Sequence, residues 1–266
     1  MIKLGVNSVL FGGLDFATAA QWVKDCGYDG IEVSAIGGMC EHLVLDRWEE
    51  QADAVRKVAA DHGLALLSME VASLDEARLA KAFAAAHALG IPVVNVGPGG
   101  KSNEPGALEQ CVATLQARAA QAARHGVTLC CKAHVGGAIF NTPTTQAAMD
   151  QIPSPAFGID MDPSHIYRAG EDPAQALPPV LRRVRHIHIR DCKGRGPGPG
   201  DPRDQACGRG DINLFGYCQA MAHGHYDGPV CLEVIGAGQY ELARRVAIAA
   251  ESYGYLNACL KQLGAR

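Results

Sequence analysis

Eight short apolar, β-branched segments recur along the chain, and segments with helical periodicity lie between them. Their starts lie about 32 residues apart on average, so eight strand–helix units account for essentially the whole chain. Alternation of strands with helices predicts βαβ units and a parallel sheet. The predicted strands are residues 2–7, 30–34, 64–71, 91–96, 126–134, 156–162, 184–191 and 228–235.

The amphipathic segments predict helices at 15–26, 47–62, 76–89 and 107–125, with a further barrel-covering helix at 241–263, in one piece or two. Eight units favour a single (β/α)8 TIM barrel that forms one domain over residues 1–266. A doubly wound open sheet is the competing architecture. It predicts a GxGxxG turn after the first strand, which VLFGGLDF does not supply.

Composition narrows the class of protein further. The net charge is −4, from 24 basic and 28 acidic residues, which argues against a nucleic-acid or membrane partner. No stretch reaches the roughly 18 apolar residues of a membrane span, and the first residues do not resemble a secretory signal. Ten scattered cysteines without a CxxC pair are expected to be reduced thiols in a cytoplasmic protein.

One long loop interrupts the pattern after the seventh predicted strand. Residues 192–213, CKGRGPGPGDPRDQACGRGDIN, are rich in Gly and Pro and carry four basic side chains. Long loops inside a compact domain are usually functional or disordered. We expect this loop to cover a substrate.

Polar side chains gather where the predicted strands end, which is where a barrel builds its active site. A buried carboxylate such as Glu233, between apolar neighbours, needs a charged partner or a cation. Asp162, His188 and Glu233 together are a plausible ligand set for Mn²⁺, Mg²⁺, Co²⁺ or Zn²⁺. The polar residues at or just after strand ends are Glu32, Glu70, Lys132, His134, Asp160, Asp162, His165, His186, His188, Arg190, Asp191 and Glu233.

Several motifs resemble those of one family. GIDMDPSH at 158–165 resembles its D-x-x-H after the sixth strand, and HIRD at 188–191 resembles its H-x-K-D after the seventh. GIEVS at 30–34, GRGDIN at 208–213 and GHYDGPVCLEVIG at 224–236 also match. The chain is therefore identified as a member of the xylose isomerase-like TIM barrels. Ketose 3-epimerases, hydroxypyruvate isomerases, inosose dehydratases and endonuclease IV belong to this superfamily.

The resemblance implies a metal set of Glu, Asp, His and Glu from strands five to eight. The last three positions correspond to Asp162, His188 and Glu233, but Lys132 stands where the relatives carry the first glutamate. Three outcomes follow. A metal remains on the other three ligands, or the Lys132 ammonium occupies its place and pairs with Asp162 and Glu233. In the third, which is compatible with either of these, a desolvated Lys132 of lowered pKa acts as a general base.

The resemblance also implies the reaction and the substrate class. A carbohydrate or polyol isomerase or epimerase would abstract a proton next to a carbonyl through an enediolate, with metal assistance. Glu233, Lys132 and His165 are the candidate catalytic residues. Dehydration of a keto-sugar or inosose by the same site is the alternative. Glu32, His134, Arg190 and Arg209 are the candidate substrate-binding residues.

Two readings from other classes remain open. A non-catalytic barrel would follow if the change to Lys132 had inactivated the site. A nuclease like endonuclease IV would need extra histidines after the second and third strands, where the sequence offers only His42 nearby. Relatives are often dimers or tetramers, which leaves a homo-oligomer open.

Overall fold

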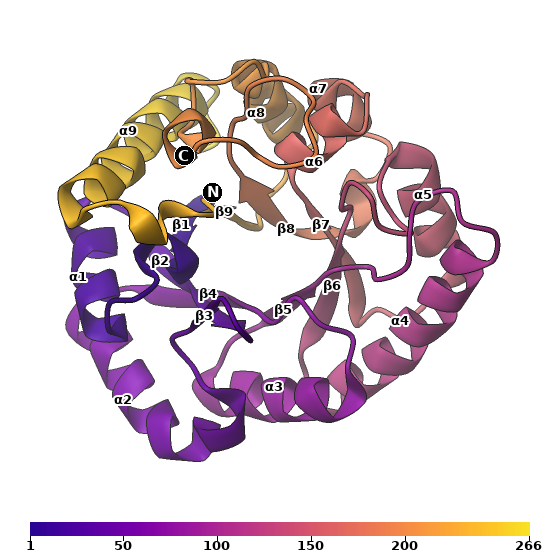
Figure 1. Cartoon of the computed structure of the whole chain (residues 1–266), viewed down its shortest axis with the longest axis horizontal. Coiled ribbons are helices and arrows are strands. Elements are labelled where there is room, and N and C mark those ends of the chain that lie inside the picture. The colour runs from indigo at the N-terminus through magenta and orange to yellow at the C-terminus, as the bar shows by residue number, and fades with distance from the viewer.

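Eight parallel strands close into a barrel inside a ring of helices (Figure 1). This is a computed structural model that describes residues 1–266. β1 pairs with both β9 and β2, which closes the sheet and confirms the predicted (β/α)8 fold. The barrel strands are β1 Lys3–Asn7, β2 Gly30–Ile36, β4 Ala65–Glu70, β5 Val93–Val96, β6 Thr128–Lys132, β7 Phe157–Met161, β8 Val184–Ile189 and β9 Pro229–Leu232.

Helices cover the outside of the barrel, and the long predicted ones form within a residue or two of their expected bounds. The C-terminal helix is one continuous element. The short strand β3, Cys40–Glu41, was not predicted and pairs antiparallel with β2. None of the helices combines the length and apolar character that a membrane crossing requires. The helices are α1 Phe16–Asp25, α2 Trp48–Asp61, α3 Glu76–Leu89, α4 Ala107–Arg124, α5 Thr142–Gln151, α6 Pro163–Arg168, α7 Pro173–Ala176, α8 Leu214–His223 and α9 Leu242–Gln262.

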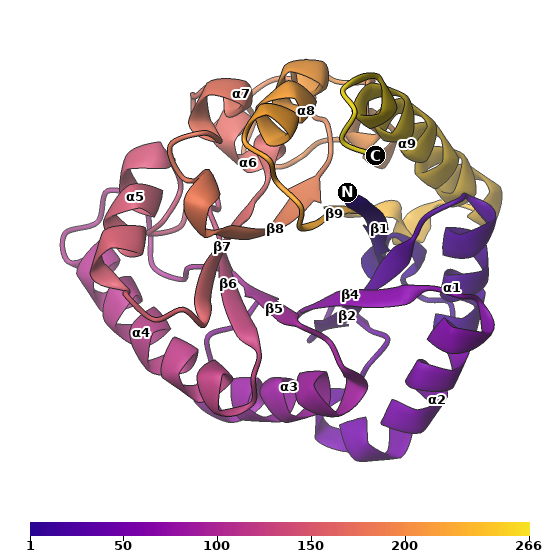
Figure 2. The same ribbon diagram turned by 180° about the vertical axis from the view of Figure 1, so that it is seen from behind.

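The two ends of the chain meet beside β1. The Ile2 amide donates to the Ala265 carbonyl at 3.0 Å, and both views of the ribbon show the ends close together (Figures 1 and 2). Arg266 forms an ion pair with Asp29, just before β2. The last residues of the chain therefore fasten α9 to the first two strands.

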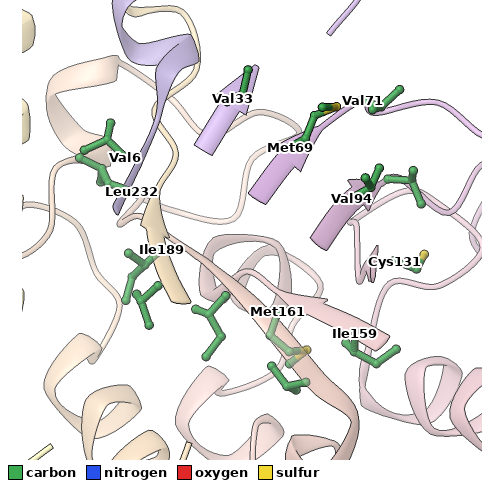
Figure 3. Close-up of a cluster of buried hydrophobic side chains, with 14 of the residues drawn as sticks. Val6, Val33, Met69, Val71, Val94, Cys131, Ile159, Met161, Ile189 and Leu232 are labelled. Atoms are coloured by element: carbon green, nitrogen blue, oxygen red, sulfur yellow. The ribbon is translucent and has the colours of Figure 1, made fainter. Parts of the chain in front are cut away.

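Side chains alternate between the two faces of the barrel wall, as a period of two requires, with register shifts at Glu32 and Asp160. Val33, Met69, Val94, Ile159 and Ile189 belong to the apolar cluster that fills the space between strands and helices (Figure 3). Glu32, Glu70, Asn95, Asp160 and His188 each neighbour one of these residues along a strand and lie on the opposite, inner face. The inner set contains one buried polar residue from each strand or its end: Asn7, Glu32, Glu70, Asn95, Lys132, Asp160, His188 and Glu233.

Hydrogen bonds across the barrel interior establish that these side chains point inward. Asn7 on β1 donates to Glu70 on β4, and Asn95 on β5 donates to Glu32 on β2. Neither pair of strands is adjacent in the sheet. Such contacts can only cross the interior, so the barrel carries a polar layer at the carboxyl ends of its strands.

Candidate active site

A cavity of about 290 Å³ opens above the polar layer at the carboxyl ends of the strands. This is the end where barrels of this fold place their active sites. Its size suits a small molecule. Its lining combines apolar and ionisable side chains: Ile36, Met39, Glu70, Ala72, Gly97, Lys132, His134, His165, Arg168, Arg190, Pro197, Pro199, Glu233 and Ile235.

The Lys132 ammonium lies in the floor of this cavity between two carboxylates. Its Nζ donates to Glu233 Oε1 at 2.9 Å and Oε2 at 3.0 Å, and to Glu70 Oε1 at 3.0 Å. Asp160 Oδ2 is 4.0 Å away. Burial alone would lower the pKa of Lys132, but the charges of Glu233 and Glu70 outweigh it and raise the pKa above its usual value. Lys132 is therefore a fixed cation at neutral pH.

Arg190 is the second cation of the floor. Its Nη2 lies 2.8 Å from Asp162 Oδ2, its Nη1 lies 3.1 Å from Glu233 Oε2, and its Nε donates to the Ser164 hydroxyl. Nη1 has no partner with hydrogen-bond geometry, although it is buried. Arg190 thus lines the cavity, and its Nη1 lies close to Glu233 without forming a hydrogen bond.

The two carboxylates around Lys132 hold their protons very differently. Burial and the nearby charge of Glu233 raise the pKa of Glu70 to about 8, despite the opposing charge of Lys132. Burial would also raise the pKa of Glu233, but Lys132 and Arg190 hold it well below its usual range. Near neutral pH, Glu233 is a carboxylate and Glu70 carries a proton for much of the time. Two carboxyl groups whose pKa values are pushed apart are typical of an acid and a base in one active site.

Helix α6 positions the next group of side chains. Asp162 accepts from the Ser164 amide as N-cap, and Pro163 occupies the first turn, so the sequence begins a helix directly at the end of β7. His165 and Arg168 are three residues apart and lie on the same face of that helix. Both line the cavity.

Two guanidinium groups flank the His165 ring. Arg168 Nη2 lies 2.9 Å from Nδ1, and Arg190 Nη2 lies 2.8 Å from Nε2. Burial and the charge of Arg190 hold the pKa of His165 well below its usual value. Desolvation and the Lys132 charge also lower the pKa of His134, whose ring centroid is 3.9 Å from that of His165. Both rings are therefore neutral at pH 7.

His188 lies beneath the cavity in a buried ionic network. Its Nδ1 contacts Asp160 Oδ2 at 2.6 Å and its Nε2 contacts Glu32. Burial would lower the pKa of His188, but Asp160 and Glu32 raise it well above its usual value. His186, on the same strand, contacts Asp160 Oδ1 at 3.0 Å and the Ser68 hydroxyl. His188 is thus an imidazolium held between two carboxylates.

The structure brings most of the sequence-predicted residues together. Lys132, His134, His165, Arg190 and Glu233 all line the cavity. Asp162 lies behind Arg190, while Glu32 and His188 lie in the network below.

Arg209 is the predicted residue that stands apart. It forms an ion pair with Glu251 on α9 at 2.7 Å and does not line the cavity. Two ionisable residues of the cavity, Glu70 and Arg168, have no role in the sequence-based predictions. Glu70 carried the strand-end signal, and Arg168 could have been found from its spacing of three from His165.

The loop 192–213 approaches the cavity with prolines and not with its cations. Pro197 and Pro199 line the cavity, and the Pro197 carbonyl accepts from Arg168 Nη1 at 3.0 Å. The loop is anchored by Asp191, whose carboxylate accepts from the amides of Cys192, Gly208 and Ile212. Lys193 forms an ion pair with Asp204 within the loop.

Buried donors that could hold a metal ion lie in the polar layer. They form three groups, namely Glu32, Glu70 and His188; Asp160, His186 and His188; and Glu32, His186 and Cys231. Asp162, His188 and Glu233 do not form such a group. Asp162 pairs with Arg190, His188 with Glu32 and Asp160, and Glu233 with Lys132. The donor set expected from the resemblance therefore does not fit a shared ion, and a lysine cation lies against its last glutamate.

A comparison with protein-family models identifies the family of this barrel. The family model described as xylose isomerase-like TIM barrel matches residues 20–259. The chain belongs to this family. No curated protein sequence gives a significant match.

Several solved structures share the fold at low sequence identity. A D-psicose 3-epimerase with D-tagatose from Clostridium cellulolyticum H10 has a TM-score of 0.78 and 15% identity, covering 97% of this chain and 99% of the other. The probable 3-DHS dehydratase involved in petrobactin synthesis from Bacillus anthracis has a TM-score of 0.78 and 15% identity, covering 96% of this chain and 99% of the other. A xylose isomerase domain protein from Planctomyces limnophilus has a TM-score of 0.79 and 18% identity, covering 100% of this chain and 99% of the other. Epimerase and dehydratase structures are thus among the neighbours in fold.

Proposed function

We propose that this protein is an isomerase or epimerase of a small polyhydroxy carbonyl compound, acting by proton transfer through an enediolate. One observation carries the proposal: Glu70 and Glu233 both line the cavity, on one ammonium group and with opposite pKa shifts. Proton transfer at a carbon next to a carbonyl needs a base, an acid and a positive charge near the developing oxyanion.

Each of these requirements has a residue in the cavity. Glu233 is ionised and takes the proton as general base. Glu70, with a pKa of about 8, carries a proton that it can give back. Lys132 stabilises the enediolate charge, assisted by the free Nη1 of Arg190. His165 and His134 are neutral rings that orient substrate hydroxyls.

The positive charge in this proposal belongs to Lys132 and not to a divalent metal ion. The raised pKa of Lys132 opposes a role as general base, since a base must be unprotonated at the working pH. Its contacts favour the second of the three outcomes considered from sequence, with Glu70 in place of Asp162 as the second partner.

Dehydration is the second candidate, since it begins with the same proton abstraction. The observation that favours it is the acidic proton on Glu70, because a departing hydroxide needs an acid. The resemblance in fold to a probable 3-DHS dehydratase agrees with this chemistry.

Solvent deuterium uptake tests the proposal directly. Ketoses, inososes and 3-keto sugars are incubated with the protein in D₂O, with and without Mn²⁺, and carbon-bound deuterium is measured by NMR. We expect exchange at the carbon next to the carbonyl of at least one compound without added metal, and its loss in Glu233→Gln. No exchange with any compound under either condition would overturn the proposal in favour of a non-catalytic barrel.

A further inference from the structure

Arg168 is a buried cation without a carboxylate partner. Its residue is 8% exposed, and it lines the cavity. Its three hydrogen bonds go to the Ser164 carbonyl, the Pro197 carbonyl and the His165 ring. None of these partners carries a negative charge, because His165 is a neutral ring.

The other two cations of the cavity differ in this respect. Lys132 contacts Glu70 and Glu233, and Arg190 contacts Asp162 and Glu233, all within 3.1 Å. These carboxylates are thus already engaged in the floor. The positive charge of Arg168 stays uncompensated above them.

Arg245 shows what a purely structural buried arginine looks like in this fold. It is also 8% exposed and forms no ion pair, but it donates to three backbone carbonyls, those of Gly12, Gly238 and Tyr240. Arg168 instead directs one of its donors to the His165 ring, and Arg190 directs a donor to the other nitrogen of the same ring. A neutral imidazole has a single acceptor nitrogen, so one of the two guanidinium groups always lacks its bond there.

We propose that the substrate is a small hydroxy acid or keto acid whose carboxylate is bound by Arg168. A buried charge is costly until an opposite charge joins it, and Arg168 lines the cavity, which has space for such a charge. The planar guanidinium is suited to a carboxylate, and one uncompensated positive charge matches a monoanion better than a phosphate dianion. This inference rests on the proposed function only for the carbonyl chemistry at the other end of the molecule.

Binding of matched probes tests the inference without turnover. D-Gluconate and D-sorbitol differ only in a carboxylate against a hydroxymethyl group, and D-sorbitol 6-phosphate supplies the phosphate arm. Titration calorimetry on the full chain should give a dissociation constant for gluconate at least about tenfold below that for sorbitol, as a charged hydrogen bond provides. Equal binding of gluconate and sorbitol, or tighter binding of sorbitol 6-phosphate than of gluconate, would overturn it.

Variants assign the effect to Arg168. Arg168→Met should abolish the preference for gluconate, and Arg168→Lys should retain part of it. Arg182→Met is the matched control, since Arg182 is an exposed arginine paired with Asp150, and it should bind like wild type. A preference unchanged in a folded Arg168→Met protein contradicts the inference. If that variant does not fold, Arg168→Lys decides: a preference weaker than that of wild type supports the inference, and a preference equal to that of wild type contradicts it.

The two proposals fail separately. Gluconate discrimination without deuterium uptake from any hydroxy or keto acid would leave the carboxylate site standing and reject the isomerase function. Deuterium uptake on neutral ketoses without gluconate discrimination would do the reverse.

Discussion

The Lys132 ammonium lies 2.9 Å and 3.0 Å from the two oxygens of Glu233, so one cation engages the whole carboxylate. β6 and β9 are separated in the sheet by β7 and β8, which means that this contact crosses the barrel. It places a positive charge beside the residue that the resemblance assigns as both ligand and base. Several measurable properties depend on this pair.

Replacement of Lys132 by Met should destabilise the protein by about 3–5 kcal/mol, because Glu70 and Glu233 would remain buried without their cation. Urea unfolding monitored by circular dichroism measures this change. In a Lys132→Met/Glu233→Gln double variant, the combined loss should be smaller than the sum of the two single losses. Strict additivity would show that the two side chains do not interact.

Metal content should respond to the charge at position 132. Protein purified without chelator is expected to contain far less than one equivalent of Mn, Co or Zn, because Lys132 holds Glu233. Lys132→Glu should acquire metal, since it replaces a cation with an oxygen donor beside two other carboxylates. Elemental analysis of both proteins measures this. Stoichiometric metal in the wild type would reject the role of Lys132 as the site's cation.

The stability of the protein should depend on pH through Glu70. Its pKa in the folded chain is raised to about 8, so the folded state holds a proton that the unfolded state releases near its ordinary value. The stabilisation from this proton is complete below the unfolded pKa and is lost as the pH rises through 8. Relative to Glu70→Gln, the wild type should lose on the order of a few kcal/mol between pH 4.5 and 9. Parallel stability curves for the two proteins would contradict the assignment.

The imidazolium state of His188 depends on Asp160. In Asp160→Asn, the pKa of His188 should fall, because one of the two carboxylates that raise it is removed. The proton chemical shift of the His188 ring, followed by NMR from pH 5 to 9, measures the change. Glu171→Gln, far from this network on the loop after α6, is the control and should leave the titration unchanged. A titration of His188 in Asp160→Asn equal to that of wild type would show that Asp160 does not hold the charge.

Loss of the Asp191 anchor should affect the loop 192–213 more than the barrel. Asp191→Ala removes three amide hydrogen bonds to Cys192, Gly208 and Ile212. Limited proteolysis should cut this variant within 192–213 faster than wild type, while the circular dichroism of the barrel stays unchanged. Equal cleavage rates would show that other contacts, such as that of Arg168 with Pro197, suffice.

The barrel could be predicted because its information is local. A short apolar, β-branched run predicts each strand. The regular spacing of these runs favours a closed barrel of parallel strands. The hairpin strand β3 was not predicted, since two residues carry no periodicity. Asp162 and Pro163 mark the start of α6 for the same local reason.

The pairing of charges could not be predicted in the same way. Many ionisable side chains lie at strand ends, and the sequence alone does not say which of them meet across the interior. One of the three outcomes considered from sequence paired Lys132 with Asp162 and Glu233, whereas Arg190 contacts Asp162 and Glu70 joins Lys132. The roles of Arg209, His134 and Glu32 toward a substrate stay predictions, as do the homo-oligomer and the cytoplasmic location.

A lysine offers a substrate fewer bonds than a metal ion does. An ammonium has three N–H donors, and Lys132 makes three hydrogen bonds, one to Glu70 and one to each oxygen of Glu233. A substrate oxygen must therefore share a donor with one of these carboxylates, and Lys132 can bind at most one such oxygen, whereas an octahedral cation can chelate two. The second oxygen of a hydroxy-carbonyl unit must find another donor, and Arg190 Nη1, which forms no hydrogen bond, is a candidate in the floor. Recognition here would depend on two fixed points on separate strands, so compounds that cannot span both should be rejected.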